Sequence, residues 1–121
     1  MEKLMIPIQG DFVAPRFDRA TEVLIAKYKD GALLGEPKTI IMERPSDEEL
    51  CHMIVEDHIT TMVCNGIEEL HYNFLIWKKV NVFDGVIGDW QTALEKILDG
   101  TLQQGTVLYP NREKTSSYET K

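Results

Sequence analysis

The sequence predicts an α/β domain in which a mixed sheet of five strands is covered by three helices, in the order β-β-β-α-β-α-β-α. Two observations carry this prediction. A hairpin signal joins two apolar runs in the first third of the chain, so the sheet begins with antiparallel strands. The later part alternates short β-branched runs with segments of helical periodicity, which is typical of strand–helix–strand units. The crossovers of such units are right-handed and leave their strands parallel, so we expect helices on both faces.

The first three strands are predicted from apolar runs and from the turn residues between them. The first is the run KLMIPI, which is almost continuously apolar, as in a strand buried on both faces. The second is TEVLIAKYK, and it ends at Asp30-Gly31, a dipeptide that favours a hairpin turn. The third is ALLGEPKTIIME, in which Gly35 and Pro37 predict an irregular strand at the edge of the sheet.

The first two helices are predicted from a capping residue or from apolar spacings of three and four residues. The first helix begins after Ser46, and Glu49 three residues later completes a capping box. The second is predicted over residues 67–77 and follows the strand TTMVC. Because the apolar residues of the second helix recur at helical spacing, we expect them, Trp77 included, to pack in the core.

The third helix follows the strand KVNVF and has the clearest end signals. Asp89 is placed to cap its first turn, and Trp90 begins an apolar stripe that continues to Leu98. Gly100 stands where a left-handed C-terminal residue is favoured. We therefore expect Trp90 to pack in the core as well.

Composition and charge bound the class of protein. With 121 residues, 43% of them hydrophobic and 27% charged, the chain is large enough for one globular domain with its own core. We expect that domain over residues 1–109 and a flexible polar tail over residues 110–121, because PNREKTSSYETK has little to bury. A net charge of −7 argues against nucleic-acid binding, which requires clustered basic residues.

The start of the chain and its two cysteines indicate a compartment. The stretch MEKLMIPIQGD lacks a signal-peptide pattern, and no apolar run is long enough for a membrane span. Two cysteines in that context predict free thiols in a reducing cytoplasm rather than a disulfide.

Three glycine-bearing turns are expected to meet at one edge of the sheet. In open α/β sheets, ligands usually bind outside the carboxyl ends of the parallel strands. The segments predicted there are Gln9-Gly10-Asp11, Cys64-Asn65-Gly66 and Asp84-Gly85. Each glycine either makes a tight turn or lets the backbone come close to a ligand. The convergence of all three segments favours a binding site.

Cys64 is the candidate metal ligand, because a thiolate at the end of a strand binds soft metals. A lone cysteine is also commonly a small buried hydrophobic residue, and the chain has no CxxC pair. His71, one turn into the second predicted helix, could reach the same edge. The chain has neither a Gly-rich phosphate loop with its lysine nor a GxSxG elbow, so we expect a protein that is not an enzyme.

Three stretches resemble a known family, and they are IPIQGDFVAPRFDRATEVLI, MVCNGIEE and KKVNVFDGVIGDWQTALEKILDGTL. They look like the dinitrogenase iron–molybdenum cofactor biosynthesis family, the nitrogenase-accessory proteins, over about Met5 to Leu108. The resemblance implies a ribonuclease-H-like fold. It also implies a protein that binds, carries or shelters metal–sulfur clusters, including iron–molybdenum cofactor and its precursors.

Two segments, the loop after the first strand and the corner at residues 65–68, match the family pattern in part. In the loop after the first strand, Phe17 and Arg19 match the family pattern, whereas Arg16 stands where the family often has His and Asp18 where it has Gly. A guanidinium cannot ligate a metal, but Arg16 could pair with an anionic cluster. The Gly-Gly-Ile-Gly corner of the family corresponds to residues 65–68, where Asn65 is expected to tolerate the same left-handed backbone.

The leading hypothesis is a small accessory protein that binds or carries an anionic iron–sulfur or molybdenum–iron–sulfur cluster and exchanges it with a donor or recipient protein. The alternative is a protein-interaction module of the same fold without metal binding, and a hydrolase is the third possibility. Under the leading hypothesis Cys64 is the metal ligand. The predicted cluster-binding residues are Gln9, Gly10, Asp11, Arg16, Phe17, Asn65, Gly66, Ile67 and Asp84.

Overall fold

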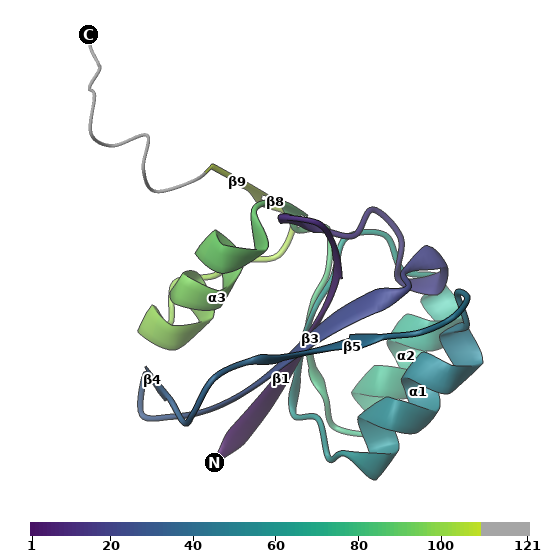
Figure 1. Cartoon of the computed structure of the whole chain (residues 1–121), viewed down its shortest axis with the longest axis horizontal. Helices are drawn as coiled ribbons and strands as arrows, with labels where there is room; N and C mark the ends of the chain where they lie inside the picture. The colour runs from purple at the N-terminus through teal and green to yellow at the C-terminus, as the bar shows by residue number, and fades with distance from the viewer. Residues whose placement is uncertain (110–121) are drawn as a thin grey trace, which may run out of the picture.

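A computed structural model describes residues 1–109, and the tail predicted over residues 110–121 lies outside the described part. The domain is an α/β structure with a mixed sheet and three α-helices (Figure 1). The strands are β1 (Glu2–Gln9), β2 (Phe12–Val13), β3 (Glu22–Lys29), β4 (Ala32–Leu33), β5 (Lys38–Ile41), β6 (Thr61–Val63), β7 (Asn81–Phe83), β8 (Ile87–Gly88) and β9 (Val107–Leu108). The helices are α1 (Asp47–Glu56), α2 (Glu69–Trp77) and α3 (Trp90–Asp99), with a 3-10 turn, η1, at Phe17–Arg19.

The sheet is built around β1. Its strand order is β4-β3-β1-β6-β7, with β5 also paired to β3 and β2 paired to β1. β1 is antiparallel to β3 and parallel to β6, and β6 is parallel to β7. β1, β6 and β7, which correspond to the first, fourth and fifth predicted strands, therefore lie side by side, with β7 at the edge of the sheet.

The predicted count of five strands is too low, because the sheet has seven. The chain turns back after β1 to add the two-residue strand β2, in a stretch predicted as a loop. The third predicted strand is divided into β4 and β5, which flank Gly35, in left-handed conformation at φ 80°, and Pro37. A separate two-stranded sheet of β8 and β9 was not predicted.

The hairpin between β3 and β4 confirms the turn prediction. Asp30 and Gly31 have φ values of 53° and 81°, and Tyr28 pairs with Leu33 across the turn. Two consecutive left-handed residues match the right-handed twist of the flanking strands, which is why an Asp-Gly dipeptide is favoured at this position.

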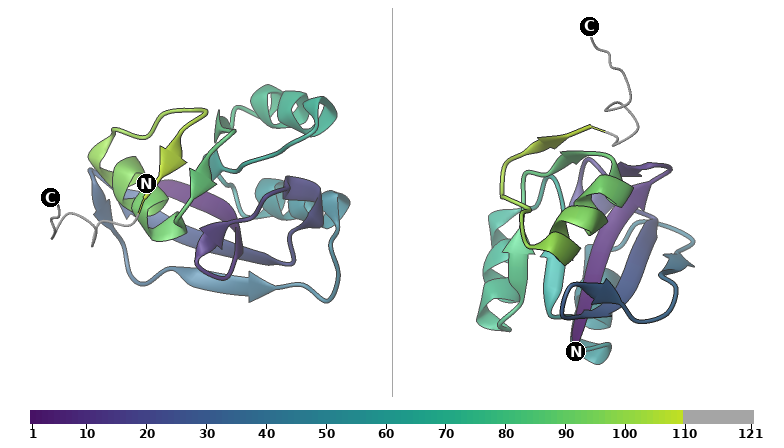
Figure 2. Two further views of the ribbon diagram at one scale, coloured as in Figure 1. Left: turned by 90° about the horizontal axis from the view of Figure 1, so that it is seen from above. Right: turned by 90° about the vertical axis from the view of Figure 1, so that its left-hand side faces the viewer.

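The core has two halves, one on each face of the sheet. Leu4 and Ile6 of β1 belong to the half that packs against Leu94 of α3. Met5, between them, belongs to the half that packs against Leu50 of α1, together with residues of α2. Because side chains alternate along a strand, the continuous apolar run of β1 supplies both halves. Helices cover both faces of the sheet, as predicted, with α3 on one face and α1 and α2 on the other (Figure 2).

The caps of α1 and α3 confirm their predicted ends. The Ser46 hydroxyl oxygen accepts a hydrogen bond of 3.0 Å from the backbone N–H of Glu49. The Asp89 carboxylate accepts one of 2.8 Å from the N–H of Thr92, and Gly100 ends α3 with φ at 79°. Within residues 1–109, no helix combines the length and the apolar character needed to cross a membrane.

The apolar face predicted for α2 is correct only in part. Leu70 and Trp77 are 73% and 72% exposed, and Leu75 is the buried residue of this helix. The helix begins at Glu69 rather than Ile67, and Ile67 and Phe74 pack partly buried against the core half that contains Leu75. Trp90, by contrast, packs against the core half beneath α3.

Gly88 in β8 offers a test of how closely β8 and β9 approach. Its φ is 123°, and a Cβ at this position would overlap the carbonyl oxygen of Leu108. We expect Gly88→Ala to lower the free energy of unfolding by roughly 1–3 kcal/mol, measured by urea denaturation. Gly35→Ala is the control, because its φ of 80° is also left-handed but a Cβ there meets nothing within 4 Å. Equal losses in the two variants would contradict the close approach.

Candidate functional site

The turns at the carboxyl ends of β1 and β6 meet in one cavity. Gln9, which ends β1, and Asn65, which follows β6, both line a cavity of about 410 Å³. The third turn adjoins them, since the backbone N–H of Gly85 donates a 3.0 Å hydrogen bond to the carbonyl oxygen of Asn65. The expected convergence of the three segments at one edge of the sheet is therefore present. The cavity, called the crevice below, is lined by Gln9, Phe12, Val13, Pro15, Asn65, Ile87 and Gly88.

A backbone pairing beside the crevice joins the loop after β2 to the corner after β6. The N–H of Gly66 donates to the carbonyl oxygen of Pro15 at 2.9 Å, and the N–H of Phe17 donates to the carbonyl oxygen of Gly66 at 2.7 Å. Pro15 and Asn65 line the crevice, whereas their successors line a second hollow of about 270 Å³. This second cavity, called the arginine hollow below, is lined by Arg16, Asp18, Gly66, Ile67 and Glu68.

Gly66 is required by this close approach and not by its backbone angle. A Cβ on Gly66 would lie 2.9 Å from the carbonyl oxygen of Pro15, closer than side-chain carbons come to backbone oxygens. Neither Asn65 nor Gly66 has a positive φ, so the left-handed backbone expected at Asn65 is wrong. The backbone of this corner pairs with the loop at Arg16. The pairing brings the two backbones so close that only a residue without a side chain fits at position 66.

Gly10 and Asp11 are held by α3 and are not among the residues that line the crevice or the arginine hollow. The Trp90 indole Nε1–H donates to the carbonyl oxygen of Gly10 at 3.0 Å, and its backbone N–H donates to that of Asp11 at 3.1 Å. Asp84 is half-buried, and its carbonyl oxygen accepts from the N–H of Gly105 at 2.9 Å. These residues fix the shape of the turns around the crevice.

Arg16 is already paired inside the arginine hollow. Its Nε and Nη2 donate to the two carboxylate oxygens of Asp18, each at 3.0 Å. This hydrogen bonding with Arg16 lowers the pKa of Asp18, so the carboxylate stays charged and holds the guanidinium. With Glu68 in the same wall, one positive and two negative side chains give the hollow a net charge of −1. Asp18 and Glu68 oppose an external anion that approaches the exposed donors of Arg16.

Cys64 lies in the core behind the crevice. Its side chain is 1% exposed and belongs to the core half that also contains Phe17 and Leu75. Burial, assisted by the negative charge of Asp84, raises the pKa of the Cys64 thiol to about 12. The thiolate that would bind a soft metal is therefore not the resting form near neutral pH. Metal ligation by Cys64 stays a prediction, and it would require the core to open locally.

The buried thiol leads to a labelling prediction. In Cys51→Ser protein, which leaves Cys64 as the remaining cysteine, a thiol reagent at pH 8 should react slowly in the native state and rapidly in urea. The reason is that the raised pKa and the 1% exposure suppress both thiolate formation and access. The measurement is the time course of absorbance with a chromogenic disulfide reagent. Native labelling as fast as in urea would place the thiol at the surface.

The apolar wall of the crevice was missed by sequence reasoning. Phe12 and Ile87 are 58% and 48% exposed, although both are large hydrophobic residues beside the cavity. The available signal was an aromatic residue inside a stretch predicted as a loop, directly after Gly10-Asp11. His71, in contrast, does not line the crevice. Its Nε2 lies 2.8 Å from a carboxylate oxygen of Asp47, in the groove between α1 and α2.

No protein-family model matches the chain, and no curated protein matches its sequence significantly. Solved structures are similar. The crystal structure of PH0822 is 15% identical with a TM-score of 0.75, covering 84% of this chain and 93% of the other. A candidate dinitrogenase (MJ0327) of Methanocaldococcus jannaschii is 22% identical with a TM-score of 0.68, covering 84% and 91%. A candidate NifB protein of Thermotoga (TM1290), of the DUF35 family, is 17% identical with a TM-score of 0.65, covering 92% and 99%. These proteins share the fold of this chain.

Proposed function

We propose that this chain is a small accessory protein, not an enzyme, that holds an anionic metal–sulfur species in the crevice and passes it to another protein. The observation that carries the proposal is that two residues with amide side chains, Gln9 and Asn65, line one cavity whose other lining residues are apolar. The amides come from the ends of two adjacent parallel strands, which is where α/β sheets usually bind ligands.

The chemistry of the crevice suits a soft anion better than a compact one. Its volume of about 410 Å³ is in the range of small-molecule sites, which are mostly apolar with a few placed polar groups. A metal–sulfur cluster spreads its charge over polarisable sulfurs and is tuned by hydrogen bonds to them. Amide N–H groups can donate those bonds, while Phe12 and Ile87 contact the sulfur-covered faces. A phosphate or carboxylate would lose more hydration free energy on entering the crevice than it would regain from contacts with the apolar wall.

The comparisons support the same class of function without identifying the cargo. Two structures that share the fold are named as nitrogenase-related candidates, MJ0327 and TM1290. The resemblance of three sequence stretches to the nitrogenase-accessory proteins rests on the residues themselves and not on the fold. The order of β5, β3, β1, β6 and β7 supports the ribonuclease-H-like arrangement that this resemblance implies.

Hydrogen bonds and enclosure would hold the cargo, because the thiol of Cys64 is buried. A cluster bound in this way keeps its own exogenous ligands, so it can leave without breaking a metal–ligand bond to the protein. Weak retention of this kind suits a carrier that delivers to a recipient protein. Arg16 would add a positive charge at the rim once released from Asp18.

Anaerobic reconstitution tests the proposal. The protein is incubated with iron, sulfide and tetrathiomolybdate, desalted, and measured by visible absorption and metal analysis. We expect a coloured complex with a fixed metal content, and loss of most of the bound metal in the Gln9→Ala/Asn65→Ala double variant. Gln103→Ala is the matched control, because Gln103 is an exposed amide outside the crevice lining. Equal metal content in the two variant proteins would remove the crevice as the binding site.

The Arg16–Asp18 pair gives a second test, in which the direction of the expected change in anion affinity is defined. Asp18→Asn removes one negative charge and the bidentate partner of Arg16, so the hollow changes from a net charge of −1 to 0. We expect tetrathiomolybdate to bind roughly two- to fivefold more tightly, measured by equilibrium dialysis at low salt. Adding Arg16→Gln to Asp18→Asn should abolish the gain. A gain that persists in the double variant would show that Arg16 takes no part.

A protein-interaction module without metal binding is the second candidate, and exposed apolar residues favour it. Phe12 and Ile87 stand at the crevice, and Trp77 is 72% exposed on α2. Phe12 and Ile87 line one cavity, and exposed apolar residues that adjoin one another are typical of contact surfaces. Two results together would favour this candidate. The protein takes up no metal, and a partner protein is recovered less well with the Phe12→Ser variant than with the unaltered chain.

A further inference from the structure

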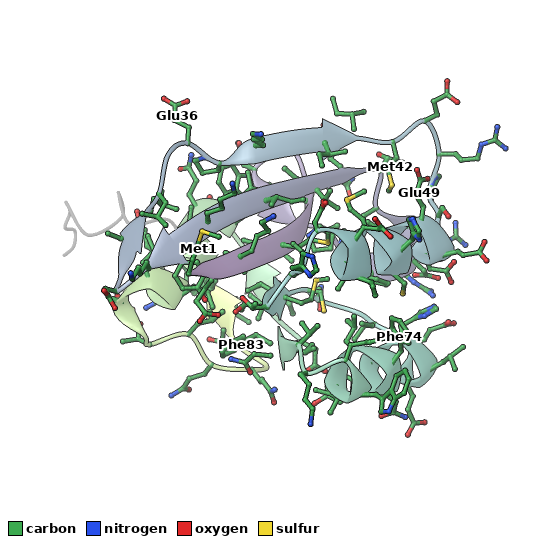
Figure 3. The ribbon with its side chains drawn as sticks, turned by 90° about the horizontal axis from the view of Figure 1, so that it is seen from below. Met1, Glu36, Met42, Glu49, Phe74 and Phe83 are labelled. Carbon is green, nitrogen blue, oxygen red and sulfur yellow. The ribbon has the colours of Figure 1, made fainter. Side chains whose placement is uncertain are left out.

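Three side chains that can ligate a metal meet between α1 and α2, away from the crevice lining, and a cysteine lines the groove beside them. Asp47 is the first residue of α1, Glu68 precedes α2, and His71 lies in the first turn of α2. One potential ligand atom from each of these three lies within 4.8 Å of the others. Cys51 lines the same groove of about 410 Å³ as Asp47 and His71. Figure 3 shows α1, which carries Glu49, and α2, which carries Phe74, side by side.

We infer that this groove binds one divalent transition-metal ion, with Asp47, Glu68 and His71 as ligands and Cys51 as the fourth. The inference does not rest on the proposed function, because it uses none of the residues that line the crevice. It assigns a mononuclear site to the interface between α1 and α2.

The spacing of the donor atoms fits a small ion. The Nε2 of His71 lies 2.8 Å from Oδ2 of Asp47 and 3.6 Å from Oε1 of Glu68. Ligands at about 2.1 Å from a tetrahedral zinc ion stand roughly 3.4 Å apart. The two separations from His71 lie on both sides of that value, and all three donor atoms lie within 4.8 Å of one another.

The site combines one fixed ligand with two adjustable ones. The His71 side chain is 13% exposed, and its ring packs against the buried ring of Phe17 with centroids 5.7 Å apart. Asp47 and Glu68 are 43% and 57% exposed, so their carboxylates can move toward an ion. A preorganised metal site requires a ligand whose orientation is already fixed, and the largely buried imidazole of His71 supplies it.

Cys51 lies outside the three-residue group, so its side chain would have to turn toward the ion to become the fourth ligand. It follows Asp47 by four residues on α1, which puts both residues on one face of that helix. Burial and the charge of Asp47 raise the pKa of the Cys51 thiol in the absence of an ion. A bound divalent cation reverses that effect and deprotonates a coordinating thiol.

The donor types select the class of metal. An imidazole, a thiolate and two carboxylates suit Zn²⁺, Fe²⁺ or Co²⁺, whereas Mg²⁺ and Ca²⁺ prefer oxygen alone. Within residues 1–109, no lysine or arginine lies within ion-pairing distance of Asp47 or Glu68. Glu48 also lines the groove, so its local charge favours a cation.

Cobalt is the probe, because its absorption reports both geometry and thiolate ligation. The full chain, reduced and stripped of metal, is titrated with Co²⁺ alone and then with Zn²⁺ in competition. We expect one equivalent of Co²⁺, visible d–d bands of a tetrahedral site, and a thiolate charge-transfer band in the near ultraviolet. Cys51→Ser should remove the charge-transfer band, and Zn²⁺ should displace the cobalt.

Matched variants decide between a metal site and a simple hydrogen bond between helices. His71→Gln and Glu68→Gln should each weaken Co²⁺ binding about tenfold or more. His52→Gln, which alters an exposed histidine of α1, should leave it unchanged. Circular dichroism checks folding, and Glu68→Gln keeps the test valid if His71→Gln unfolds. Absence of Co²⁺ binding in the unaltered chain, or equal binding in the Glu68→Gln and His52→Gln proteins, would overturn the inference.

Discussion

The close approach of two backbone segments at Gly66 is the constraint on which the crevice and the arginine hollow both depend. Gly66 donates to Pro15 and accepts from Phe17, with donor–acceptor distances of 2.9 and 2.7 Å, so the loop after β2 is fastened to the corner after β6. Phe17 is fully buried beneath that pairing and anchors it to the core half under α1 and α2. A side chain at position 66 would push the segments apart, and the walls of both cavities would separate with them.

The two cavities on either side of this pairing have different electrostatic characters, and that difference restricts what each can bind. The crevice offers neutral amides and apolar surface, whereas the arginine hollow contains a closed ion pair and an additional carboxylate, Glu68. A soft anion loses little hydration in the crevice and gains hydrogen bonds there. A compact anion would require an uncompensated positive charge, and the charge of Arg16 is offset by Asp18. The cargo of the proposed carrier is therefore selected by polarisability rather than by charge alone.

The sequence predicted the elements whose signals are local and missed those set by long-range contacts. The hairpin at Asp30-Gly31 and the caps at Ser46 and Asp89 follow from side chains acting on their own backbone, and all three are present. The orientation of α2 is set by the surface it packs against, so its apolar spacing did not reveal that Trp77 is exposed. The position of Cys64 at a strand end likewise did not reveal whether its thiol faces the cavity or the core, because the loop that covers it comes from elsewhere in the chain.

Glu68 belongs both to the arginine hollow and to the three-residue group proposed to bind an ion. It lines the arginine hollow and also lies 3.6 Å from Nε2 of His71 in the three-ligand group. A divalent ion held by Glu68 would neutralise that carboxylate and remove the excess negative charge of the hollow, leaving the Arg16–Asp18 pair at net zero. An anion entering beside Arg16 would then meet less repulsion, and by linkage it would strengthen ion binding by the same factor. The coupling needs no movement of the fold, because one side chain belongs to both sites.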